Sequence, residues 1–507
     1  MKHIITYSIA VMLAALSSGC SETTEIGPGE PAVPAYVEVS TDKLIFDSDG
    51  GVASLAVATN AAGWDYAGTG DWFTVTRKDD NTLTVDASIN TAPEALTGAI
   101  VISGEKDGEQ VSATVTLVQR AERSVNLSAD GTSNCYIART GKAYKFDATV
   151  KGNGKGDGRS EYIAAYGVEI SGIASADLLW ESRNDGDKTM SREIIDGAPS
   201  YKNGYVAFST GRSQGNAVIA VKDIYGDILW SWHIWVCDDE ITSHDHINSA
   251  REVAAQIMDR NLGALNNKPM DIDNRGMFYQ WGRKDPFTPS RSPYNEEAHG
   301  GNVPEYNKAN YEIGNGTGAW LLHEKALPLT TPPGNIPYSI LNPMTFLQPY
   351  FSDNYNWYCA STVENVAHSD LWGAEKTIFD PCPVGYKVPG RDLWGIPSGN
   401  TSLRNGGPME DYDENGVSDK WDWNKGEKCG RCWKYTGDYY PMVGNIYYTS
   451  INQTTHNYAS GQAFYWTCAP TPETNKADSY RQDFNENWAI YQTGAHVYSA
   501  QIRCVKE

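Results

Sequence analysis

Positively charged residues are scarce in this chain. Among its 507 residues, 41 are Lys or Arg and 63 are Asp or Glu, which gives a formal net charge of −22. No basic patch stands out, which argues against binding to nucleic acid or electrostatic attraction to an anionic membrane surface. A strongly acidic chain is better suited to holding divalent cations.

Long apolar runs are also lacking. The apolar stretch from Ile4 to Leu16 has thirteen residues, too few for a membrane-spanning helix. It follows Lys2, a layout typical of a secretory signal over residues 1–19. The small residues directly before Cys20 resemble the processing site of bacterial lipoproteins. This resemblance implies a lipidated Cys20 and a flexible tether over residues 20–36; the alternative is an ordinary cleaved signal beside a chance cysteine.

Signatures of catalysis are few. His323-Glu324 begins the zincin motif, but Leu327 occupies the place of the second His. The glycine-rich segment 151–158 has neither dinucleotide-binding nor P-loop spacing and is typical of a loop. The sequence therefore predicts a protein that is not an enzyme, although carboxylate pairs that cleave glycosidic bonds are recognised only by their distances.

Eight cysteines remain besides Cys20, an even number that suits an oxidising compartment. They predict up to four structural disulfides, with the pairing left open. Cys429 and Cys432 have the spacing of a redox or zinc pair. No βαβ pattern and no second ligand pair accompanies them, so structural disulfides are favoured.

Residues 37–121 show alternating apolar and polar side chains between Gly, Asn and Asp turns, which predicts a β-sandwich. The order and spacing of several segments resemble the BACON family; these are Trp64, residues 71–75, residues 83–85, Asn90, residues 97–102 and residues 118–120. The resemblance implies an immunoglobulin-like fold that binds carbohydrate or mucin, or else a spacer. Trp72 is expected in the core.

Residues 122–245 are predicted to form a second β-sandwich-like domain. Residues 205–210, 217–221 and 228–236 are strand-like, and the last two are joined by a hairpin-type connection. In the last strand Trp230, Trp232 and Ile234 share an apolar face, whereas Ser231 and His233 lie on a mixed face. We interpret His233 as a satisfied or exposed strand histidine rather than a ligand.

Residues 246–507 have many aromatics, long loops and little periodicity, and residues 249–258 fit a short helix or a strand. Several segments resemble the FISUMP-type (major-paralogue) domain; these are residues 258–263, 276–282, 380–389, 465–466 and 502–505. The resemblance implies a loop-rich mixed α/β domain, distantly similar to C-type lectins and formylglycine-generating enzymes, with ligand sites on long loops. Residues 286–379 are an insertion without assignment.

One acidic segment has the spacing of a twelve-residue calcium loop. Its oxygen ligands would fall at positions 1, 3, 5, 7, 9 and 12, with Gly416 at position 6. In that order the predicted ligands are Asp411, Asp413, Asn415, Val417, Asp419 and Asp422. Asp at position 12 resembles dockerin-type loops, and no amphipathic helices flank the segment. We expect structural Ca²⁺ here; the alternative is an acidic surface loop.

Aromatic residues are abundant, with 16 Trp and 30 Tyr. Flat rings beside Asn and Asp suit sugar rings, which have apolar faces and polar edges. We expect most of these aromatics to pack a core and a few to form platforms, with Trp357, Trp394, Trp421 and Trp423 as the candidates.

These observations predict an exported outer-membrane lipoprotein at the cell surface, held to the membrane by its lipid anchor only. The predicted function is non-catalytic binding of carbohydrate or host mucin glycans. One alternative is a structural or adhesive, fimbria-associated protein with protein partners. The other is an enzyme on a formylglycine-generating-type scaffold.

Overall fold

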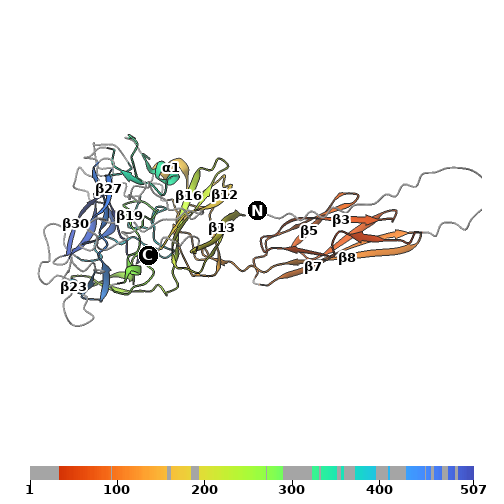
Figure 1. The fold of residues 1–507 in the computed structure, drawn as a ribbon, viewed down its shortest axis with the longest axis horizontal. Coiled ribbons are helices and arrows are strands. Elements are labelled where there is room, and N and C mark those ends of the chain that lie inside the picture. Colours follow the sequence, from red (N-terminus) through yellow and green to blue (C-terminus); the bar gives the residue numbers. More distant parts are fainter. Residues whose placement is uncertain are drawn as a thin grey trace, which may run out of the picture. The chain divides into compact units, whose positions relative to one another are not determined.

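The computed structural model describes residues 33–92, 94–156, 161–183, 193–269, 271–288, 323–329, 333–350, 356–358, 371–395, 409–411, 430–450, 453–457, 462–470, 478–485 and 489–507. Strands dominate these ranges (Figure 1). The chain divides into two compact units, Met1–Glu122 and Arg123–Glu507. The prediction of a mainly β, multidomain protein is confirmed. Within the described ranges no helix is long and apolar enough to cross a bilayer.

The first unit is a sandwich of two four-stranded sheets with the orders β1-β3-β6-β5 and β2-β8-β7-β4. The strands, drawn in red to orange in Figure 1, are β1 Val37–Val39, β2 Lys43–Phe46, β3 Gly51–Thr59, β4 Trp64–Thr69, β5 Phe73–Asp79, β6 Thr82–Ala87, β7 Leu96–Lys106 and β8 Glu109–Gln119. The unit ends one residue beyond the predicted boundary at 121.

Alternation along the strands builds the core of this sandwich. Val115 and Leu117 of β8 are fully buried, whereas Thr116 between them is exposed. Trp72 is also buried and packs edge-on against Phe73, with ring centroids 4.9 Å apart. The prediction that Trp72 belongs to the core is confirmed.

The second unit begins with another pair of four-stranded sheets, with the orders β10-β16-β15-β12 and β13-β14-β11-β9. Their strands are β9 Val125–Asn126, β10 Cys135–Ala138, β11 Ala143–Asp147, β12 Ser175–Ser182, β13 Ile195–Lys202, β14 Tyr205–Thr210, β15 Gly215–Lys222 and β16 Ile228–Val236. The short helix α1 spans Glu161–Tyr166. The predicted strands 205–210 and 228–236 match β14 and β16 at both ends.

Strand β16 is covered on both faces. On one face Trp232 packs against Phe146 of the facing sheet, with ring centroids 5.0 Å apart. On the other face Ser231 Oγ donates to Asp285 Oδ1 (2.7 Å) and Trp235 Nε1 donates to the Ala264 carbonyl (3.0 Å). One hydrophobic core therefore runs across the boundary expected at residues 245 and 246, and both predicted domains belong to one compact unit.

The described remainder of the second unit contains several small sheets (Figure 1). Its strands are β17 Ser243–Ile247, β18 Val253–Met258, β19 Tyr279–Gln280, β20 His323–Lys325, β21 Phe346–Gln348, β22 Tyr386–Lys387, β23 Met409–Asp411, β24 Gly430–Trp433, β25 Asp438–Pro441, β26 Asn445–Ser450, β27 Gln453–Asn457, β28 Gln462–Pro470, β29 Asp478–Asn485, β30 Ala489–Ala495, β31 Ser499–Ala500 and β32 Val505–Lys506. The 3-10 helix η1 spans Ile272–Asn274 and the helix α2 spans Ile336–Leu341. Residues 249–258, left open between helix and strand, contain β18.

His233 lies inside this shared core with both ring nitrogens occupied. Asn216 Nδ2 donates to the Gly263 carbonyl (3.0 Å), so its Oδ1 faces His233 Nε2 at 2.8 Å and accepts from it. Tyr279 Oη lies 3.1 Å from Nδ1 and donates to it. These contacts fit the neutral ring, and burial lowers the pKa of His233 to about 3. The interpretation as a satisfied histidine is confirmed.

This burial predicts acid sensitivity of the second unit. An unfolded His binds a proton near pH 6.5, whereas folded His233 does not, so stability is present above pH 6.5 and falls as the pH drops toward 3. The expected loss is about 1.4 kcal/mol per pH unit. Urea denaturation between pH 7 and pH 4 measures it, and His233→Gln should flatten the slope. Burial also lowers the pKa of His246, so part of the pH dependence should remain in the variant. If stability depends on pH equally in the variant and the unaltered chain, His233 does not contribute to it.

Candidate binding cavity

Two of the four predicted sugar platforms are core residues. Trp357 is 1% exposed and its Nε1 donates to the Trp281 carbonyl (2.9 Å). Trp394 is fully buried and packs near Tyr465, with ring centroids 6.2 Å apart. Neither ring has a face that a ligand could reach. The prediction that these two residues form sugar platforms is therefore wrong, because both side chains fill the core. Trp421 and Trp423 lie outside the described residues.

The predicted calcium loop falls almost wholly outside the described residues. Asp411 ends β23, whereas Asp413, Asn415, Val417, Asp419 and Asp422 lie in the part that the structure does not describe. The same holds for the predicted lipidation site, Cys20. Within the described ranges, no group of three or more His, Cys, Asp or Glu side chains is arranged to hold a metal ion. The calcium prediction therefore stays a prediction.

The cysteines form fewer bridges than expected within the described ranges. Cys382 and Cys504 are joined in a disulfide. Cys135, Cys237 and Cys468 are buried thiols, so the number of bridges stays below the predicted upper limit of four. Cys237 shows why a thiol fits its site: its Sγ donates to the Leu265 carbonyl (3.1 Å) and burial raises its pKa to about 11. Cys359 and Cys429 lie outside the described part.

A serine motif known from hydrolases occurs at residues 211–215. Gly211-Arg-Ser-Gln-Gly215 matches the Gly-x-Ser-x-Gly sequence pattern of the nucleophile elbow in hydrolases. In that elbow the serine stands between a strand and a helix, whereas this segment joins β14 to β15, two strands that belong to different sheets. Ser213 Oγ donates to Glu193 Oε2 (2.9 Å) and is held in the turn by it. The motif is therefore a strand connection and not an elbow.

A cavity of about 840 Å³ lies in the second unit. Segments far apart in the sequence surround it: residues 153–156 with Ile163, residues 372–378, residues 387–391, residues 468–469 and Glu507. The polar and charged residues of the lining are Asn153, Lys155, Glu375, Lys376, Thr377, Lys387, Arg391 and Glu507. A concave space of this size that mixes apolar and polar groups is typical of a small-ligand site.

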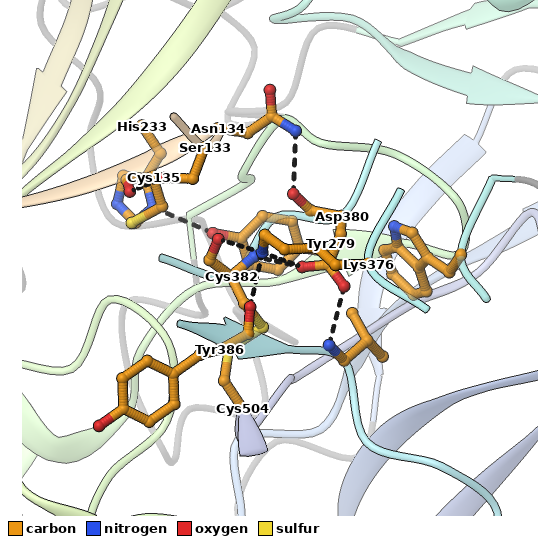
Figure 2. Close-up of a disulfide and its surroundings, with 12 residues drawn as sticks. Ser133, Asn134, Cys135, His233, Tyr279, Lys376, Asp380, Cys382, Tyr386 and Cys504 are labelled. Atoms are coloured by element: carbon orange, nitrogen blue, oxygen red, sulfur yellow. Dashed lines mark hydrogen bonds and ion pairs between the residues drawn. A yellow bond between two sulfur atoms is a disulfide. The ribbon is translucent and has the colours of Figure 1, made fainter. Parts of the chain in front are cut away.

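A buried ion pair holds the wall of the cavity. Lys376 Nζ donates to Asp380 Oδ1 (2.9 Å) and to the carbonyl oxygens of Cys382 (2.8 Å) and Tyr386 (2.6 Å). The Asp380 carboxylate also accepts the backbone N–H groups of Cys382 (2.8 Å) and Val388 (2.9 Å). Figure 2 shows Lys376 at the centre of this network. All three ammonium protons have acceptors, so the pair fixes the path of residues 376–388.

A disulfide between Cys382 and Cys504 lies beside this network (Figure 2). Cys504 directly precedes β32, and β32 pairs antiparallel with β22, where Tyr386 faces Lys506 and Lys387 faces Val505. This pairing brings Lys387 and Glu507, which are distant in the sequence, to one cavity.

The glycine-rich turn closes against this wall. Gly152 has φ +51°, and a Cβ at this position would lie 2.2 Å from the Ile378 carbonyl oxygen, so only glycine fits. Asn153 Nδ2 donates to the Lys376 carbonyl (2.7 Å), and Asn134 Nδ2 donates to the Ile378 carbonyl (2.6 Å). The prediction of a loop is confirmed for residues 151–156, and this loop places Lys155 at the cavity.

The thiol and the indole of the lining belong to the wall of the cavity. Cys468 is the thiol in the lining, and burial raises its pKa to about 11. A thiol with this pKa is protonated at neutral pH and is a poor nucleophile. The Trp372 ring is fully buried and its Nε1 donates to the Phe379 carbonyl (3.0 Å), so it supports the wall. The groups that a ligand in the cavity could contact are therefore the polar and charged side chains of the lining.

Comparisons with known proteins assign no family. No protein-family model matches the chain, and no curated protein matches it. A protein from Bacteroides thetaiotaomicron, solved by NMR, has 17% identity and a TM-score of 0.13, covering 20% of this chain and 98% of that one. An endo-fucoidan hydrolase of glycoside hydrolase family 107 has 10% identity and a TM-score of 0.17, covering 40% and 28%. Tandem immunoglobulin domains of titin have 10% identity and a TM-score of 0.17, covering 40% and 96%. At TM-scores this low the similarity is distant, and it assigns neither a family nor a function to this chain.

Proposed function

We propose that this protein is a lipoprotein of the outer membrane, exposed at the cell surface, that binds carbohydrate or mucin glycans without transforming them. The observation that carries the proposal is the cavity of about 840 Å³ with its polar and charged lining. Its volume falls in the range that holds small ligands, and amide, hydroxyl and charged groups are the partners that sugar hydroxyls need. The resemblance of residues 37–121 to the BACON family supports the same ligand class, and the resemblance of residues 246–507 to the FISUMP-type domain implies ligand sites on its long loops.

The anchor and the metal are parts of this proposal that rest on the sequence. Cys20 would carry the lipid, and residues 20–36 would tether the folded units. Ca²⁺ bound by the loop that begins at Asp411 would stabilise the second unit, because a metal that binds only the folded state raises its stability. Binding of the glycan in the cavity needs no metal in this proposal.

A glycan array tests the proposal, with the chain lacking residues 1–20 applied in calcium and again with a chelator. We expect binding to a limited set of glycans in both conditions, and a lower melting temperature with the chelator. An unchanged melting temperature would remove calcium from the proposal. The absence of binding to any glycan would contradict carbohydrate recognition.

Blocking the cavity locates the binding. A Cβ at Gly390 meets no atom within 4 Å, so Gly390→Trp should place an indole in the cavity without disturbing the wall. We expect affinity for the array's best glycan to fall at least tenfold, which corresponds to about 1.4 kcal/mol. The matched control is Gly63→Trp, which also meets open space but lies in the first unit. Equal affinities in the two variants would place the binding outside this cavity.

One observation favours the adhesive alternative. Ile224 and Tyr225, at the tip of the hairpin between β15 and β16, are 77% and 84% exposed. Exposed apolar residues at a loop tip are suited to contact with a protein partner. If adhesion is the function, bacteria that display Ile224→Ser with Tyr225→Ser should adhere to host cells less than bacteria with the unaltered chain. Equal adhesion at equal surface amounts would argue against this alternative.

A further inference from the structure

The charged groups of the cavity differ in balance from the rest of the chain. Three cations, Lys155, Lys387 and Arg391, line the cavity together with the side-chain carboxylates of Glu375 and Glu507. The whole chain has 41 cations and 63 anions. Lys376 does not enter this balance because Asp380, in the wall, neutralises it. In a chain with more acidic than basic residues, this cavity therefore gathers three cations around one space, and a cavity concentrates the field of the charges that line it.

The three cations come from two segments that are distant in the sequence and converge on one space. Lys155 follows the turn that Asn153 fixes to the wall. Lys387 belongs to β22, and its Nζ donates to the Ala374 carbonyl (2.6 Å), which holds the ammonium at the cavity wall. An ammonium has three donors, so two remain for a ligand. Arg391 follows Gly390 in the next turn.

We propose that the ligand of this cavity is a sugar residue that carries one anionic group, a carboxylate or a sulfate ester, which Lys155, Lys387 and Arg391 bind. The inference rests on the proposed function and deepens it. Charge-assisted hydrogen bonds from ammonium and guanidinium groups suit both anions. The Asn153 amide donates one proton to the Lys376 carbonyl and has a second one for a sugar hydroxyl, and Ile163 offers an apolar surface to the ring.

Matched probe pairs test the charge directly. Affinities of the chain lacking residues 1–20 are measured by calorimetry for sialyllactose and its methyl ester, and for sulfated lactose and lactose. Each pair differs in charge and little else, and the two pairs separate carboxylate from sulfate. We expect at least one anionic probe to bind about tenfold tighter than its neutral partner, with the preference decreasing as salt is added.

Variants locate the preference. Lys155→Gln with Arg391→Gln removes two exposed cations from the cavity and should abolish the preference for the anionic probe. The control is Lys142→Gln with Lys268→Gln, which removes two exposed cations outside the lining and should retain it. Equal binding of both members of each pair would overturn the inference and leave glycan binding intact. A preference that survives in the cavity variant would overturn it too. No binding of any probe, together with a silent array, would overturn both proposals.

Discussion

Asp380→Ala should lower the free energy of unfolding of the second unit by about 3–5 kcal/mol. The side chains of Lys376 and Asp380 are 3% and 1% exposed, so removing the carboxylate leaves a charged ammonium away from water. The backbone N–H groups of Cys382 and Val388 also lose their acceptor. Urea denaturation followed by Trp fluorescence measures the loss, because Trp64 and Trp72 are the only two of the 16 Trp that belong to the first unit.

Two further variants separate the charge from the packing. In Lys376→Met with Asp380→Ala no charge stays buried, so we expect a smaller loss than in Asp380→Ala alone. The exposed pair of Arg212 and Glu193 gives the baseline, and Arg212→Ala should cost less than about 1 kcal/mol. If Asp380→Ala costs no more than Arg212→Ala, the ion pair does not hold the wall.

The strands of the sandwiches could be predicted because their sequence pattern is local. β16 alternates Trp230, Trp232 and Ile234 with Ser231 and His233, and the predicted ends match the structure. The pattern says which face is apolar, but not what covers the mixed face. Residues 262–285 cover it, which is why one core spans a boundary that the sequence places at 245. The sequence did contain a signal, because Ser231 and His233 are polar side chains in a strand of otherwise apolar residues. Polar side chains within a buried strand need hydrogen-bond partners.

The cavity could not be predicted in the same way. Lys155, Lys387 and Glu507 meet because β22 pairs with β32 and the turn at Gly152 closes on Ile378. No periodicity connects residues at such separations, so only the tertiary structure brings them together. The aromatic prediction had the opposite weakness. Trp357 and Trp394 were chosen by composition, and composition does not distinguish an exposed ring from a ring that fills a loop-rich core.

Removal of the disulfide between Cys382 and Cys504 should also lower the free energy of unfolding strongly. Cys382 and Cys504 are 122 residues apart in the sequence, and closing a loop of that length restricts the unfolded chain strongly. The loop-entropy model gives a stabilisation of about 4–5 kcal/mol for it. We therefore expect Cys382→Ala with Cys504→Ala to lose that much in urea denaturation. The slope of the unfolding free energy against urea should rise, because an unfolded chain without the bridge exposes more surface.

The single variant Cys468→Ala is the control, since it removes a buried thiol that forms no bridge and should leave the slope unchanged. The double variant should also weaken binding in the cavity, because the bridge holds β32 against β22 and thereby positions Lys387. If the double variant lost stability without a change in slope, the bridge would act through packing in the folded state. If it kept both stability and affinity, the pairing of β22 with β32 would be sufficient to hold the cavity wall.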